Sequence, residues 1–192
     1  MKKIVKILAA ACAAVLVLAG CGGSNGTPVE ATEGALQAIQ AADADAFYRY
    51  ASEDSTLFAD SETWGEGEWQ LMKLMYQNLT YVIKGSSIDG DTATVTADIT
   101  NTDFSQILMT AMNEIVSATM SGELTEADEA KIADFMITSM QEAANSGDVE
   151  TATETVDITL EKDGDDWKVQ TDDTLLNALG GGNLDSVTEM LQ

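Results

Sequence analysis

The chain has 192 residues, with 33 Asp and Glu against 9 Lys and Arg, 2 Cys and no His. A net charge of -24 argues against nucleic acid and anionic lipid as partners, because binding to phosphates depends on Lys and Arg. The absence of His excludes Ser-His-Asp and Cys-His triads and every His-ligated metal site. A solvated, repulsive surface is the ordinary consequence of such acidity, and association with cations is the more specific one.

The first twenty residues have the layout of a secretory signal. Three lysines precede an apolar run from 7 to 17, which is too short to span a membrane stably. The run ends in Leu18-Ala19-Gly20-Cys21, which resembles the lipobox of bacterial lipoproteins. An ordinary secretory signal or a short buried helix is the alternative. The resemblance implies a diacylglyceryl group on Cys21, removal of residues 1–20, and attachment to the extracytoplasmic face of the cell membrane.

The lipobox also predicts the domain organisation. Two acyl chains anchor a protein stably, whereas one gives only marginal binding. Residues 21–29 then comprise the lipidated Cys and a flexible polar tether, and residues 30–192 form a single domain. Cys12 leaves with the leader and Cys21 is acylated, so no thiol remains for a disulfide, a metal or a nucleophile.

Two helices are expected at the start of the domain. Residues 30–52 carry apolar side chains at three-to-four spacing, and residues 66–78 have a broad apolar side. Asp43 interrupts the first pattern. Its short carboxylate favours the cap of a second helical segment, with a buried acid in a pocket as the alternative.

Two β-hairpins follow. In 79–101, Ala93, Val95, Ala97 and Ile99 alternate with polar residues after an Asp89-Gly90-Asp91 turn. A calcium loop is the alternative for this turn, but the ligand spacing and distal Glu of an EF-hand are missing. In the second hairpin, residues 155–161 alternate, residues 162–165 turn the chain, and Trp167 and Val169 return on the core face.

A pair of helices is predicted between the hairpins. Asp103 is expected to cap a helix reaching Ser121 and ended by Gly122, and Thr125 begins a capping box for a helix stopped by Gly147. A short link predicts an antiparallel pair. We expect this pair to pack on the concave face of the sheet and to close it almost fully. Partial closure would instead leave a Met-rich apolar ligand site.

The chain is expected to end in short helical pieces. Residues 175–179 predict a small apolar helix that three glycines at 180–182 interrupt. Leu184, Val187 and Leu191 then form either a small docking helix or a frayed end.

The segments 88–95, 100–104 and 163–169 are similar to those of small cell-envelope lipoproteins of Gram-positive bacteria. The resemblance implies an α+β, NTF2-like (cystatin-like) domain of unknown function. Its antiparallel sheet is formed by two β-hairpins packed against helices, here with a helix pair inserted between the hairpins. The same fold includes ketosteroid isomerase, which uses carboxylates and Tyr in a cone-shaped pocket. None of those catalytic residues aligns with this chain.

An enzyme on this fold needs a carboxylate in an apolar cleft. The candidates are Asp43, Asp98, Tyr48 and Tyr81, each also explained as a surface or core residue. Arg49, the sole Arg, could clamp an anionic ligand or form a plain ion pair.

The sequence therefore favours a membrane-anchored extracytoplasmic lipoprotein acting as a non-catalytic binding or interaction module, without cofactor or metal. A pocket enzyme using Asp and Tyr and a small-ligand carrier are the alternatives. The expected partners are the membrane, through Cys21, and a protein or an apolar small molecule.

Overall fold

The computed structural model describes residues 26–124, 129–146 and 149–182. The elements in chain order are α1 (Pro28–Ala41), α2 (Ala44–Tyr50), the 3-10 turn η1 (Ser61–Thr63), α3 (Glu66–Tyr76), β1 (Thr80–Asp89), β2 (Thr92–Thr102), α4 (Phe104–Ser121), α5 (Glu129–Asn145), β3 (Thr151–Asp163), β4 (Asp166–Val169) and α6 (Asp173–Leu179). None of the described helices is both long enough and apolar enough to span a bilayer. The expected α+β class, with an antiparallel sheet from two hairpins, is confirmed, and the arrangement is consistent with an NTF2-like fold.

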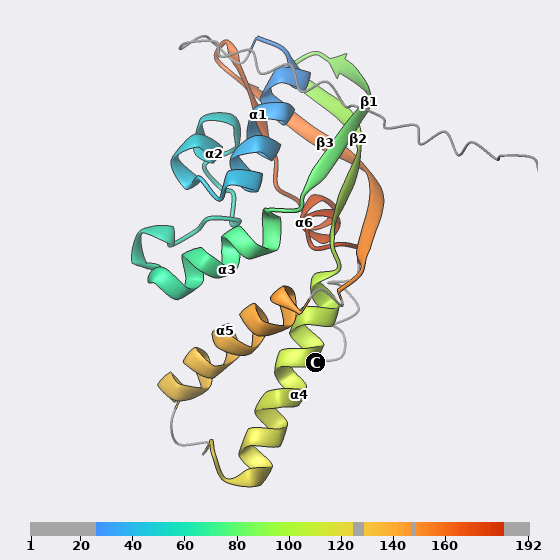
Figure 1. Cartoon of the computed structure of the whole chain (residues 1–192). Coiled ribbons are helices and arrows are strands. Elements are labelled where there is room, and N and C mark those ends of the chain that lie inside the picture. Colours follow the sequence, from blue (N-terminus) through green and yellow to red (C-terminus); the bar gives the residue numbers. More distant parts are fainter. Residues whose placement is uncertain (1–25, 125–128, 147–148, 183–192) are drawn as a thin grey trace, which may run out of the picture.

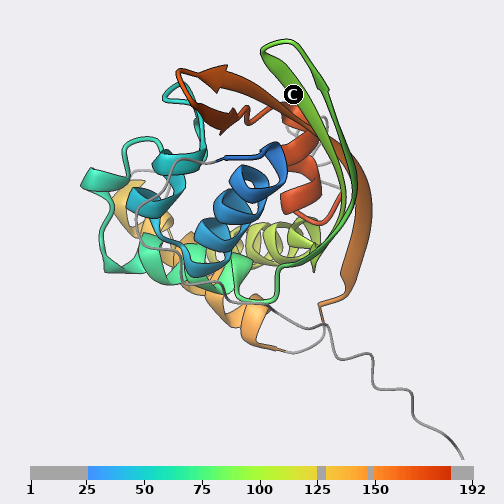
Figure 2. The ribbon, with the colours of Figure 1, turned by 90° about the horizontal axis from the view of Figure 1, so that it is seen from above.

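The sheet has the order β1-β2-β3-β4, with every neighbouring pair antiparallel. Its two hairpins turn at Gly90 and Gly164, which have φ of 64° and 62°. These positive angles are the ones that a tight hairpin needs and that glycine adopts at little cost. The hairpin interpretation of Asp89-Gly90-Asp91 is therefore confirmed. The sheet is strongly curved along its length (Figure 2).

Alternation along the strands separates an apolar face from a polar one. Val95 pairs with Ile158 and Ala97 with Val156, and all four are buried. On the opposite face the pairs are hydrogen-bonded polar residues, such as Thr96 with Asp157 at 2.6 Å. Period-two patterning therefore places one face of the sheet on the core and the other toward water.

The predicted helix over 30–52 is two helices, because the chain turns at Ala42 and Asp43. Ala42 adopts a left-handed conformation with φ of 50°, which ends α1. Oδ1 of Asp43 then accepts a hydrogen bond of 2.9 Å from the amide of Ala46 and caps α2. The capping interpretation of Asp43 is confirmed. The buried-acid alternative is wrong, because this side chain is exposed.

The apolar face of the sheet is covered by α1 and α6 (Figure 2). Leu36 and Ile39 of α1 and Leu179 of α6 are almost completely buried in one cluster with the strand residues. Alanines at 31, 35 and 38 share the buried side of α1, and their small side chains allow a close approach to the sheet. The expectation that the later helix pair covers this face is wrong.

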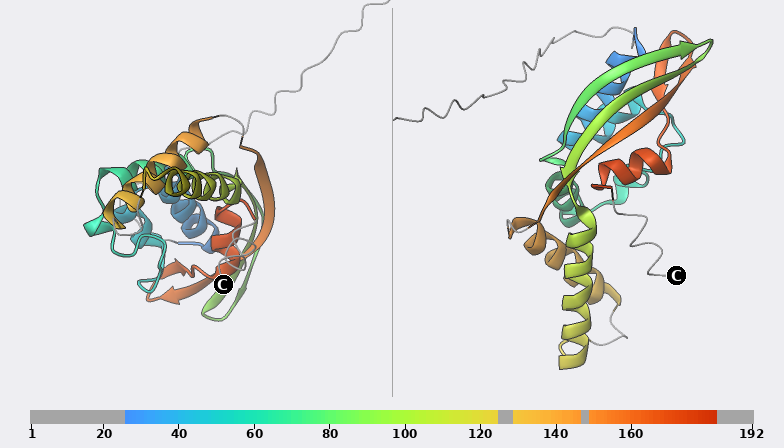
Figure 3. Two further views of the ribbon diagram at one scale, coloured as in Figure 1. Left: turned by 90° about the horizontal axis from the view of Figure 1, so that it is seen from below. Right: turned by 90° about the vertical axis from the view of Figure 1, so that its right-hand side faces the viewer.

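Instead, α4 and α5 form a helical hairpin that projects beyond the end of the sheet (Figures 1 and 3). We call this hairpin the arm. It has its own small cluster of buried residues, namely Phe104, Ile107, Ala111, Met140 and Ala143. The physical reason is that β2 runs directly into α4 at the sheet end, and the apolar side of α4 is buried by α5. Leu71 and Met75 of α3 pack on the same cluster and join the arm to the body.

The ends of α4 are as expected. The Oδ1 atom of Asp103 accepts from the amide of Ser105 at 3.1 Å, and Gly122 closes the helix with φ of 80°. The predicted capping box at Thr125, the stop at Gly147 and the closing segment after Gly182 lie outside the described residues.

Candidate functional site

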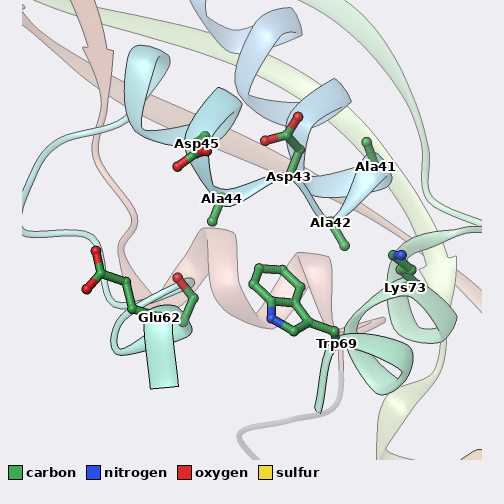
Figure 4. Close-up of a pocket in the computed structure, with 9 residues that line it drawn as sticks. Ala41, Ala42, Asp43, Ala44, Asp45, Glu62, Trp69 and Lys73 are labelled. Carbon is green, nitrogen blue, oxygen red and sulfur yellow. The ribbon is translucent and has the colours of Figure 1, made fainter. Parts of the chain in front are cut away.

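A surface hollow of about 470 Å³ lies where the junction of α1 and α2 faces η1 and α3 (Figure 4). Its lining residues are Ala41, Ala42, Asp43, Ala44, Asp45, Ser61, Glu62, Trp69 and Lys73. We call it the acidic hollow. A second hollow of about 370 Å³ adjoins it, shares Asp45 and Glu62, and adds Tyr48 and Asp60.

Local turns bring these acids together. Asp43 is the N-cap of α2, and Asp45 lies in its first turn. Glu62 lies in the 3-10 turn η1. Asp60, which has a left-handed φ of 57°, is the N-cap of this turn. Short helices and a tight turn thus gather carboxylates from two segments of the chain on one rim, a charge concentration that attracts cations.

The base of the hollow is aromatic. In Figure 4 the indole of Trp69 lies between Glu62 and Lys73, below the α1–α2 junction that carries Asp43 and Asp45. It contacts Trp64 edge-on at 5.1 Å between centroids and stacks with Phe58 at 6.4 Å. Phe58 is buried against Phe47, so the aromatic group continues into the core. Trp69 is therefore held in place by its neighbours while it remains half-buried.

A hollow lined by an indole and by three carboxylates is suited to an organic cation. Cations are attracted to the face of Trp, most strongly when other groups remove water from the contact. The acidic hollow is lined by three carboxylates and by a single ammonium group, that of Lys73. Over the part of the chain that the structure describes, no cluster of Asp, Glu, His or Cys is arranged to hold a metal ion.

The structure separates the four candidate catalytic residues. Asp43 lines the acidic hollow and Tyr48 the adjoining one, whereas Asp98 and Tyr81 belong to the sheet. Tyr48 donates a long hydrogen bond of 3.4 Å to the carbonyl of Ser55. No acid–base pair is formed among the four.

Asp98 lies on the polar face of the sheet. Its carboxylate contacts Nζ of Lys84 at 2.6 Å and accepts from the hydroxyl of Thr155 at 2.8 Å. The hydrogen bonds from Lys84 and Thr155 lower the pKa of Asp98. A general acid needs the opposite shift, so this environment is that of a structural ion pair.

Tyr81 lies at the edge of the core. Burial raises the pKa of its hydroxyl, and the hydrogen bond that Gln37 donates at 3.2 Å acts in the opposite sense. Arg49 is exposed on α2 and does not line the acidic hollow. Its backbone carbonyl accepts a hydrogen bond of 2.7 Å from Lys168.

The residues that sequence reasoning missed are Trp69, Asp45 and Glu62. Trp69 lies on the apolar side of a helix, a position usually explained by core packing. The signal available in the sequence was the pair of acids around Ala44, directly after a helix. It gave no indication that residues 61–62 would face them.

No curated protein and no solved structure matches this chain. Residues 65–181 match the model of a family described as a domain of unknown function, DUF5105. The match begins at α3 and includes the whole sheet, the arm and α6, so it contains Trp69 and Lys73 but not the acids of the hollow. Because the match covers more than half of the residues of this chain, the chain belongs to the DUF5105 family.

Proposed function

We propose that this chain is a lipid-anchored extracytoplasmic protein that acts as a non-catalytic binding module. The observation that carries the proposal is the filled core. Where an NTF2-like enzyme has a cone-shaped pocket, α1 and α6 pack on the sheet, and Val95, Ile99 and Leu160 are fully buried beneath them. A ligand or partner is therefore bound at the surface of the module.

The proposed anchor is supported by Leu18-Ala19-Gly20-Cys21, and the position at which the fold begins is compatible with it. Thr27 caps α1, with its hydroxyl accepting from the amide of Glu30 at 3.2 Å, only a few residues after Cys21. Five residues extend at most about 18 Å, so the module stays close to the membrane.

Replacing Cys21 with Ala tests the anchor. We expect the parent chain to be recovered with the membrane fraction and the variant to be recovered as soluble or unprocessed protein, because two acyl chains supply the binding. Fractionation of expressing cells measures where the protein is recovered, and mass spectrometry of the N-terminal peptide measures whether it is processed and acylated. A variant that stays with the membrane, or an unmodified Cys21 in the parent, contradicts the anchor.

The acidic hollow is the surface we propose for the ligand, and the ligand is an organic cation. The three carboxylates and the exposed side of Trp69 supply charge and a cation–π face together. The net charge of the chain suggests association with cations, and the acidic hollow is a specific place for it. The pocket-enzyme alternative is less well supported, because hydrogen bonds hold the pKa of Asp98 low.

Choline, a small quaternary ammonium, is a suitable probe. We expect it to shift the indole NMR signal of Trp69, and its neutral tert-butyl analogue to leave that signal unchanged. Followed through the methyl NMR signal of choline itself, Trp69→Leu should weaken binding roughly 2- to 30-fold through the lost cation–π contact. Asp45→Asn should weaken it up to about fivefold, as for an exposed charge pair.

Asp173→Asn is the matched control, because Asp173 is an exposed acid in the first turn of α6, outside the acidic hollow. It should bind choline like the parent. Equal shifts with choline and its neutral analogue, or equal losses in Asp45→Asn and Asp173→Asn, would show that the acidic hollow does not select cations.

A further inference from the structure

The outer side of α4 carries four exposed residues at 4-3-4 spacing, Met109, Asn113, Val116 and Met120. We call them the outer strip. Met120 is 85% exposed, Val116 56% and Met109 46%. The spacing is that of the a and d positions of two heptads, the pattern with which helices pair. Large apolar side chains grouped on one exposed face, rather than scattered, are typical of an interaction surface.

The outer strip points away from the rest of the arm. Phe104, Ala111 and Ala118, which are spaced by one heptad on the other side of α4, are buried. Two of these, Phe104 and Ala111, belong to the cluster that joins α4 to α5. The side of α4 opposite to them is therefore the one that α5 does not cover.

Charge is nearly absent from this helix. Of the 18 residues of α4, Glu114 is the only charged one, in a chain whose net charge is -24. The positions that flank the outer strip are also neutral, namely Thr110, Met112, Ser117 and Thr119. Two copies of so acidic a chain repel each other wherever acidic surfaces meet. At the outer strip no acidic side chains would be brought together, so this repulsion is avoided.

The hydroxyl groups beside the outer strip already have hydrogen-bond partners within α4. The hydroxyls of Thr110, Ser117 and Thr119 each donate a 2.9 Å hydrogen bond to the carbonyl four residues earlier. Covering them therefore leaves no hydroxyl donor unsatisfied. Asn113 carries a donor and an acceptor, so it can pair with the same amide of another copy. A single Asn at such a position is a known determinant of helix register.

We propose that the outer strip binds a second copy of this chain, with α4 pairing with α4. The arm projects from the body, so its outer side is accessible (Figure 3, right). Because the contact spans only two heptads, it is weak in solution and is strengthened where copies are concentrated. A lipid surface is less suitable, since α4 lacks the Lys and Arg of interfacial helices. In addition, α1 begins at the end of the body opposite to the arm (Figure 1).

Thiol cross-linking tests the contact. Val116→Cys places a thiol in the outer strip, and the processed protein is purified from expressing cells and treated with a short bismaleimide over a range of concentrations. We expect a covalent dimer whose yield rises with concentration. Adding Met120→Lys should lower the yield at least about tenfold, because it places an ammonium group in an apolar contact.

Thr138→Cys is the matched control, as Thr138 is exposed on α5 of the same arm. The parent chain reports any cross-link that arises from Cys21. Circular dichroism verifies that each variant is folded. Equal dimer yields at Val116→Cys and Thr138→Cys would indicate random collision and overturn the proposal. So would the absence of a dimer up to about 1 mM, or loss of the cross-link when vesicles are added.

Discussion

Replacing Trp167 with Ala is expected to lower the free energy of unfolding by ~3–5 kcal/mol, the range for a large aromatic removed from a core. Trp167 is 5% exposed and lies in the main cluster beneath α1. It is one of only four residues in β4, which pairs with β3 and, through Val169, also bridges Ala51. Nζ of Lys162 lies 5.9 Å from the ring centroid, so the ring is also covered from the side of the paired strand.

Urea unfolding followed by circular dichroism measures this change. Trp64→Ala is a suitable comparison. Trp64 is half-buried at the periphery of the aromatic group, so its replacement should lower the free energy of unfolding by less. If Trp167→Ala unfolds at the same urea concentration as the parent, β4 does not contribute to the core in the way that its burial indicates.

Local sequence signals predicted most of the helices and strands, but they did not predict which helices cover the sheet. Alternation in residues 93–99, glycine at each hairpin turn and Asp at 43 and 103 are short-range features, and each is found where it was expected. Periodicity identifies the side of a helix that is buried but not what buries it. Both α1 and α4 have apolar stripes long enough for the sheet, and the sheet is covered by α1 and α6.

The candidate site shows the same limit at the level of single residues. Asp43 was expected as a cap, and it is one. Its presence on a shared rim with Glu62 depends on the turn after Phe58 and on a left-handed Asp60, which no short pattern indicates. Trp69 belongs to the broad apolar side that was predicted for residues 66–78. It is half-buried because the acidic hollow opens above it.

Gly181→Ala is expected to destabilise the fold by ~2–5 kcal/mol. Gly181 has φ of 84°, a left-handed angle that costs an L-residue about 1–2 kcal/mol. A Cβ there would also lie 2.6 Å from the carbonyl oxygen of Thr102 and 2.7 Å from Cα of Asp103. Both are backbone atoms, so relief requires a shift of the chain, for which overpacking costs of about 1–3 kcal/mol are typical.

The same contact joins α6 to the start of the arm. The amide of Phe104 donates to the carbonyl of Gly180 at 3.0 Å, and Nδ2 of Asn101 donates to Leu179 at 2.6 Å. Hydrogen exchange should therefore speed up in α6 and at the base of α4 in Gly181→Ala. Gly164→Ala is the matched control, with φ of 62° but open space around the new Cβ, so it bears the conformational cost alone. Equal losses of stability in the two variants would show that α6 does not approach Thr102 as closely as described.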